Sequence, residues 1–181
     1  SSFMKRLLTL LFGLVSLTTA TADPRAVATS INTFGLELHR RLAVEGGNLV
    51  TSPWSIESAL AMTWAGAANQ TKTEMQTVLR LPEDEAAVHA GFASLAADLD
   101  ALAQKSQDRV KAARRSGGPA TALEINAANR LFGDRGYPFE KPFLSLTEKF
   151  YGAPLEALDF RKSPEAARLR INGWVASRTK D

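Results

Sequence analysis

Along most of the chain, apolar residues recur every three or four positions, the spacing of one helix face. Four regions follow this pattern, at 24–46, 88–102, 139–151 and 163–175. We therefore predict an amphipathic helix in each region, with its apolar stripe buried. The stripes consist of Val27, Ile31, Phe34, Leu38 and Leu42; Val88, Phe92, Leu95, Leu99 and Leu102; Phe139, Phe143, Leu146 and Phe150; and Ala167, Ile171, Trp174 and Val175.

The region that follows Asn48 is different, because its apolar residues do not keep to one stripe. Ser52 is a good N-cap and Pro53 suits the first helical position, so a helix is expected to begin there. A helix that is apolar nearly all round is buried on most sides. Glu57 and several polar neighbours interrupt the apolar run, which makes a membrane span a poor alternative. We expect a central helix that the other elements surround.

Further helix starts are visible in the polar residues. Asp23 and Ser163 each precede a proline, as an N-cap precedes the first helical residue. The stretch 71–74 fits a capping box that begins at Thr71. Asn69 also begins a glycosylation sequon, but the cap already explains Thr71, so glycosylation of Asn69 stays an open question. The acidic run 83–85 is interpreted as favouring a helix N-terminus rather than as a catalytic carboxylate pair.

Two segments have the pattern of strands. Apolar and polar residues alternate over 123–131, and a turn is expected at 133–136. The segment 153–160 is extended, and Pro154 favours an edge strand. With a short extended piece at 48–51, the count is six helices and two or three strands, an α+β chain. Two strands alone cannot protect their edges, so we expect that the chain stops before its sheet is complete.

Composition excludes several classes of site. The chain has no cysteine, so disulfides and thiolate chemistry are absent. Its histidines are His39, expected at the surface, and His89, which stands one position off the 88–102 stripe and is expected to face solvent. Two histidines make a multi-histidine metal site improbable. We expect no cofactor.

Residues 1–22 resemble a secretory signal. Lys5 and Arg6 precede an apolar core at 7–17, and Ala20-Thr21-Ala22 is a cleavage pattern. The expected mature domain is 23–181; an N-terminal membrane anchor is the alternative. Without Lys5 and Arg6, 20 basic residues remain against 19 acidic ones, so the net charge gives no argument for nucleic acid or a membrane surface.

No catalytic motif is present: there is no nucleophile elbow, P-loop, zinc-protease motif or dinucleotide fingerprint. We therefore do not expect an enzyme. Instead, five motifs occur in the order and spacing typical of one family, and together the chain from 33 to 179 resembles the N-terminal half of a serpin, a serine protease inhibitor. The motifs are Asn48 with Ser52-Pro53-Trp54-Ser55-Ile56 through Leu79; Asn126-Ala127-Ala128-Asn129-Arg130-Leu131-Phe132; Phe150-Tyr151-Gly152-Ala153; Leu158-Asp159-Phe160; and Ile171-Asn172-Gly173-Trp174-Val175 with Thr179.

The resemblance implies a fold of three sheets and about nine helices, of which this chain would hold helices A–F and the first strands of sheet A. It also implies a trap, in which a reactive loop near the C-terminus is cut by a protease and inserts into sheet A. This chain would lack that loop and would not inhibit by itself. Ser52, Pro53 and Ser55 match the family's shutter, the region beneath sheet A where strands part; a plain helix cap is the simpler interpretation of the same residues.

The basic stretch from Lys105 to Arg115 lies in a segment, 104–121, that loses helical periodicity. It follows the helix that would correspond to helix D, which binds glycosaminoglycans in some serpins. Either this stretch extends the helix or, as we expect, it is a solvated, flexible loop broken by Gly117-Gly118-Pro119. Its candidate polyanion-binding residues, displaced from the usual helix D positions, are Lys105, Arg109, Lys111, Arg114 and Arg115.

The sequence is compatible with three functions. The first is a secreted serpin whose full-length form inhibits a serine protease, its expected partner. The second is a non-inhibitory serpin-fold carrier or chaperone. The third, an unrelated secreted helical enzyme, is disfavoured by the missing motifs.

Overall fold

The computed structural model describes residues 23–113, 116–117 and 121–179. This part of the chain forms six α-helices, one short 3-10 helix and one two-stranded sheet, which confirms the expected α+β class. In chain order the elements are α1 (Pro24–Leu42), η1 (Ala43–Glu45), α2 (Pro53–Ala65), α3 (Asn69–Leu79), α4 (Glu85–Ala113), β1 (Leu131–Asp134), α5 (Lys141–Tyr151), β2 (Leu155–Leu158) and α6 (Pro164–Thr179).

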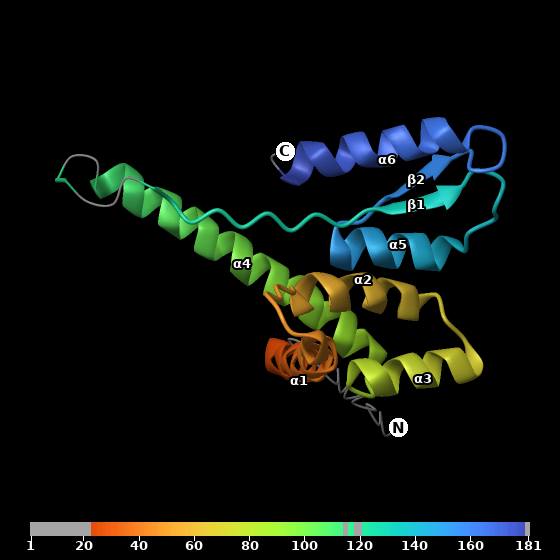
Figure 1. Cartoon of the computed structure of the whole chain (residues 1–181), viewed down its shortest axis with the longest axis horizontal. Helices are drawn as coiled ribbons and strands as arrows, with labels where there is room; N and C mark the ends of the chain where they lie inside the picture. The colour runs from red at the N-terminus through yellow and green to blue at the C-terminus, as the bar shows by residue number, and fades with distance from the viewer. Residues whose placement is uncertain (1–22, 114–115, 118–120, 180–181) are drawn as a thin grey trace, which may run out of the picture.

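The elements are arranged in layers (Figure 1). The sheet lies between α6 and α5, and α2 lies on the other side of α5, next to α1 and α3. Helix α1 packs on α2, α3 and α4, while α5 packs on α2 and α4. The C-terminal half of α4 projects away from the other helices, with the extended segment 121–130 running beside it. Within the described residues, no helix is both long and apolar enough to cross a membrane.

The core lies where α1 to α4 meet. Val27 of α1 and both Val88 and Phe92 of α4 are almost wholly buried, as the helical stripes predict. Leu102, at the far end of the α4 stripe, is 50% exposed, because α4 has left the bundle by that point. The buried cluster consists of Val27, Ile31, Phe34, Ala61, Trp64, Leu79, Leu81, Val88 and Phe92.

Helix α2 is the central helix that the sequence predicts. It contacts α1, α3 and α5, and Trp54 at its start reaches Phe92 of α4 with ring centroids 5.8 Å apart. Trp64, at its other end, is 1% exposed and donates its indole N–H to the Lys72 carbonyl at 3.1 Å. Both ends of α2 are therefore anchored by tryptophans in the helical core.

Three predicted helix starts are confirmed, after Asp23, Ser52 and Ser163, and one is wrong. Asp23 accepts a hydrogen bond from the Arg25 N–H at 2.9 Å, and Ser52 accepts one from Ser55 at 3.4 Å. The capping box at Thr71 does not form, because α3 already begins at Asn69. The Lys72 N–H bonds to the Ala68 carbonyl at 3.3 Å, so the first turn closes before Thr71 can act as its cap.

The sheet is shorter than its sequence pattern suggests. Strands β1 and β2 run parallel, with Leu131 opposite Leu155 and Asp134 opposite Leu158. The prediction of a strand over 123–131 is wrong in extent, since the ladder covers 131–134 only. The preceding residues are extended but have no ladder partner in the described part of the chain, and β2 begins only after Pro154, which has no N–H to donate.

Helix α6 is held on the sheet mainly by polar and aromatic contacts. Arg170 makes two hydrogen bonds to Glu156 of β2, at 2.6 and 2.9 Å. Trp174 packs edge-on against Phe132 of β1 at 5.6 Å. Of the four residues predicted to face the core, only Ala167 is buried, and Val175 is 40% exposed. The predicted face of α6 is therefore the one that lies on the sheet, but its side chains are much less buried than expected.

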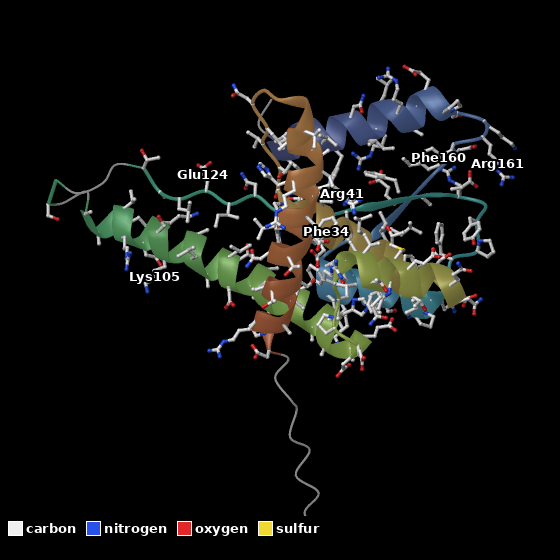
Figure 2. The ribbon with its side chains drawn as sticks, turned by 60° about the horizontal axis from the view of Figure 1, so that its bottom comes forward. Phe34, Arg41, Lys105, Glu124, Phe160 and Arg161 are labelled. Carbon is white, nitrogen blue, oxygen red and sulfur yellow. The ribbon has the colours of Figure 1, made fainter. Side chains whose placement is uncertain are left out.

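The basic stretch is helical as far as Ala113, so the expectation of a loop is wrong for residues 104–113. Lysine, arginine, glutamine and alanine, which dominate this stretch, are good helix formers. Asp108 also supports the helix, through Gln104 at 3.1 Å and Lys111 at 3.6 Å. Figure 2 shows Lys105 on the side of α4 away from the extended segment that carries Glu124.

Candidate functional site

The three predicted shutter residues lie together at the N-terminus of α2. Ser52 is the N-cap, Pro53 the first helical residue and Ser55 the third, and the two serine hydroxyls are 2.9 Å apart. Pro53 packs against α1 so closely that a Cβ on Gly35 would lie 2.5 Å from its Cγ. The start of α2 is thereby fixed against α1, while both serine side chains stay exposed.

The serine pair can bond to a further group. One hydroxyl donates to the other, and the accepting hydroxyl keeps its own proton. Because both side chains are exposed, that proton and the remaining lone pairs are accessible to a further partner. The arrangement can therefore bond a backbone N–H or C=O of a segment that passes over the start of α2.

A cleft of about 480 Å³ lies beside this site. Its wall includes Trp54 and Ser58 of α2, Phe92 of α4, Arg130 of the extended segment and Trp174 of α6. Ser58 is 1% exposed, and its hydroxyl has no hydrogen-bond partner within the described residues; the same is true of the Trp174 indole nitrogen. The sequence pattern had assigned neither group to a site.

His89 is buried, and the expectation that it faces solvent is wrong. It is 1% exposed, and its Nδ1 lies 2.6 Å from the Tyr151 hydroxyl of α5. Helix α5 packs on the face of α4 next to the apolar stripe and covers His89, so the buried face of α4 is wider than the stripe. Phe150 and Trp64 contact the imidazole ring as well, at centroid distances of 6.1 and 5.5 Å.

Burial lowers the pKa of His89 below its ordinary value of 6.5, although Glu85 opposes this effect. The His89 Nε2 lies 3.6 Å from the Glu85 carboxylate, and Glu85 is also paired with Lys72 at 2.6 Å. Burial likewise raises the pKa of the Tyr151 phenol. The neutral imidazole is therefore the favoured form, and it joins α4 to α5.

Glu57, the one charged residue between Gly46 and Thr71, is wholly buried in α2. It is hydrogen-bonded to the Ser30 hydroxyl of α1, and burial raises the pKa of its carboxyl to about 7 despite that bond. A single charged residue within an apolar run is the sequence signal that could have identified Glu57 as a buried carboxyl. His39, in contrast, is exposed as predicted.

Of the candidate polyanion-binding residues, Lys105, Arg109 and Lys111 are exposed on α4. Arg114 and Arg115 lie outside the described residues, as do residues 1–22 with the predicted signal. Within the described ranges, no three histidine or carboxylate side chains are grouped so that they could hold a metal ion.

The model of the serpin family, the serine protease inhibitors, matches residues 29–181. The chain belongs to the serpin family. Among its curated serpin relatives, the leukocyte elastase inhibitor of Bos taurus is 39% identical over 133 residues, 74% of this chain and 30% of the relative. An uncharacterised serpin-like protein of Thermococcus kodakarensis is 36% identical over 86% of this chain and 33% of its own length.

Antithrombin-III of Mus musculus is 35% identical over 75% of this chain and 27% of its own length. Among solved structures, "Cleaved Serpin 42Da" superposes with a TM-score of 0.65 and 26% identity, covering 87% of this chain and 38% of that one. The chain thus spans about a third of the length of the curated relatives it matches. The resemblance inferred from the five motifs, to the N-terminal part of a serpin, is confirmed.

Proposed function

We propose that the full-length protein that carries these residues inhibits a serine protease by trapping it. The observation that carries the proposal is the match of residues 29–181 to a family described as serine protease inhibitors. Relatives named as inhibitors, such as the bovine leukocyte elastase inhibitor, support it. In this role the protein is not an enzyme. The protease supplies the catalytic serine, and the inhibitor supplies the reactive loop that is cut and then inserted into its sheet as a strand.

In the proposed mechanism, a reactive loop outside these residues is cut and adds a strand to the sheet that contains β1. The extended segment 121–130 continues β1 on its N-terminal side, so in the full-length protein it would lengthen this sheet. Ser52 and Ser55 would act as the shutter, bonding a strand above α2 in the closed state and releasing it when the sheet opens. Pro53 would hold the start of α2 against α1 during that movement.

We also propose that residues 1–22 direct export and that 23–181 belong to the mature extracellular domain. A glycosaminoglycan is a secondary candidate partner. It would bind Lys105, Arg109 and Lys111, which are exposed in the C-terminal part of α4. Asp108 neutralises part of this charge by pairing with Lys111 at 3.6 Å. We therefore expect any such binding to be weak.

The test is whether the full-length protein forms a covalent complex with a serine protease. After incubation with trypsin-like, chymotrypsin-like and elastase-like proteases, a band of the combined mass that survives boiling in detergent is expected with at least one of them. The control is each protease with its serine blocked beforehand, which should give no band. Cleavage of the loop by all three proteases without any such band would refute inhibition and favour the carrier or chaperone function.

A further inference from the structure

A single hydroxyl group joins three helices in the core. Ser30 of α1 is 2% exposed and bonds to the carboxyl of Glu57 in α2, which is 0% exposed. The same hydroxyl lies 3.0 Å from the carbonyl of Leu79, the last residue of α3. Ser30 therefore faces two acceptors, although it carries only one proton.

The protonation state of Glu57 decides whether these groups are satisfied. If Glu57 is ionised, Ser30 can donate to the carboxylate or to the Leu79 carbonyl, but not to both. If Glu57 is neutral, it donates to Ser30, and Ser30 donates to Leu79. The other carboxyl oxygen of Glu57 has no partner within the described residues, so a buried negative charge there would also lack compensation.

We propose that Glu57, Ser30 and the Leu79 carbonyl form a proton-dependent latch that ties α1, α2 and α3 together while Glu57 is protonated. When Glu57 ionises, its carboxylate and the Leu79 carbonyl compete for the single proton of Ser30. The contact between α1, α2 and α3 then opens more readily. The latch is separate from the serine pair at the start of α2 and does not depend on inhibition of a protease.

The surrounding charges do not provide an alternative partner. Lys72 of α3 pairs with Glu85 of α4 at 2.6 Å, and none of the ion pairs within the described residues involves Glu57. The charges of Glu57 and Glu85 both raise the pKa of the Tyr151 phenol in α5. The other titratable groups on the packed helices are Arg25, Glu37, His39, Arg40 and Arg41 of α1, Glu74 of α3, His89, Asp98, Asp100, Lys105, Asp108, Arg109 and Lys111 of α4, and Lys141, Glu148 and Lys149 of α5. Arg80, directly after α3, is paired with Glu37.

The direction of the pH effect follows from the pKa of Glu57, which burial raises from 4.5 to about 7. The closed state binds the proton more tightly than an open state does. The stabilisation is therefore fully present below pH 4.5 and is lost as the pH rises through about 7. Between pH 5.5 and 8.0, the equilibrium constant for closing should fall roughly 30-fold from this group alone. His89, whose pKa is lowered, acts in the opposite direction below pH 6.5.

The test uses the full-length protein and its Glu57→Gln variant, whose amide can donate to Ser30 at every pH. Hydrogen exchange of the α1–α3 amides, corrected for the intrinsic pH dependence of exchange, is measured at pH 5.5 and 8.0. Relative to Glu57→Gln, wild-type protection should fall roughly 30-fold between the two pH values. The comparison cancels the effect of His89, which both proteins share. The control variant Glu83→Gln, which changes an exposed carboxyl, should behave as the wild type.

Equal pH dependence in the wild type and Glu57→Gln would overturn the proposal. A second measurement applies even if that variant folds poorly. Difference infrared spectroscopy of the wild type should show the band of a protonated carboxylic acid at pH 6.0, which disappears as the pH rises to 8.5. The band should persist in Glu83→Gln. A wild-type spectrum without a protonated carboxyl at pH 6.0 would also overturn the latch.

Discussion

Replacing Ser55 by leucine in the full-length protein is expected to produce polymers on mild heating and to raise the ratio of cleaved inhibitor to trapped protease. Ser55 lies 2.9 Å from Ser52 at the exposed start of α2, where the proposed shutter strand passes. A leucine would overfill the space beneath that strand, at a cost of roughly 1–3 kcal/mol. The sheet would then open without cleavage. Ser52→Ala, which loses a cap worth about 1 kcal/mol, should show a weaker form of the same effects.

A helix cap far from the shutter provides the matched control. Asp84 caps α4 by accepting a hydrogen bond from the Ala87 N–H at 3.1 Å. Asp84→Ala should lower the melting temperature about as much as Ser52→Ala does, but without polymers and with an unchanged ratio. If the serine variants behave like Asp84→Ala, then Ser52 and Ser55 form only a helix start, and the shutter proposal should be dropped.

A second large effect is expected where α1 crosses α4. A Cβ on Gly91 would lie 2.5 Å from Cγ2 of Val27, so even Gly91→Ala requires the two helices to separate. Gly91→Val should destabilise the protein by about 3 kcal/mol, the upper part of the usual range for overpacking. The measurement is the melting temperature of the full-length variants. Gly173→Ala on α6, where a Cβ meets nothing within 4 Å, should instead stabilise by roughly 0.5–1 kcal/mol.

A double-mutant cycle separates this clash from a general effect of helix propensity. Val27→Ala removes the atom that Gly91→Ala would strike, so the double variant should be more stable than the sum of the two single losses implies. If Gly91→Ala stabilises the protein as Gly173→Ala does, the close approach of α1 and α4 is wrong.

Local signals made several features predictable from sequence. A cap followed by proline identifies the starts of α1 and α2, because both residues act on the backbone directly beside them. Gly152, in the left-handed conformation with φ of 58°, ends α5 where the sequence places the end. The cap at Ser52 was predictable for the same reason, whereas the shutter role of Ser52 and Ser55 follows only from the family resemblance and stays a proposal.

Features that depend on distant segments were not predictable. The burial of His89 is set by Tyr151, which lies 62 positions away in α5. The extent of β1 is set by β2, so alternation over 123–131 could not define the ladder. Glu57 was visible as an isolated charge, but its partner Ser30 lies on another helix and has no pattern of its own.

The most direct test of a trapping inhibitor is the melting temperature of the full-length protein before and after a single cut in its reactive loop. If the cut loop inserts as a new strand, the cleaved protein gains ladder hydrogen bonds and buried area. A trap therefore predicts that the cleaved form melts at a markedly higher temperature than the intact form. A cleaved form that melts at the same or a lower temperature would contradict the mechanism.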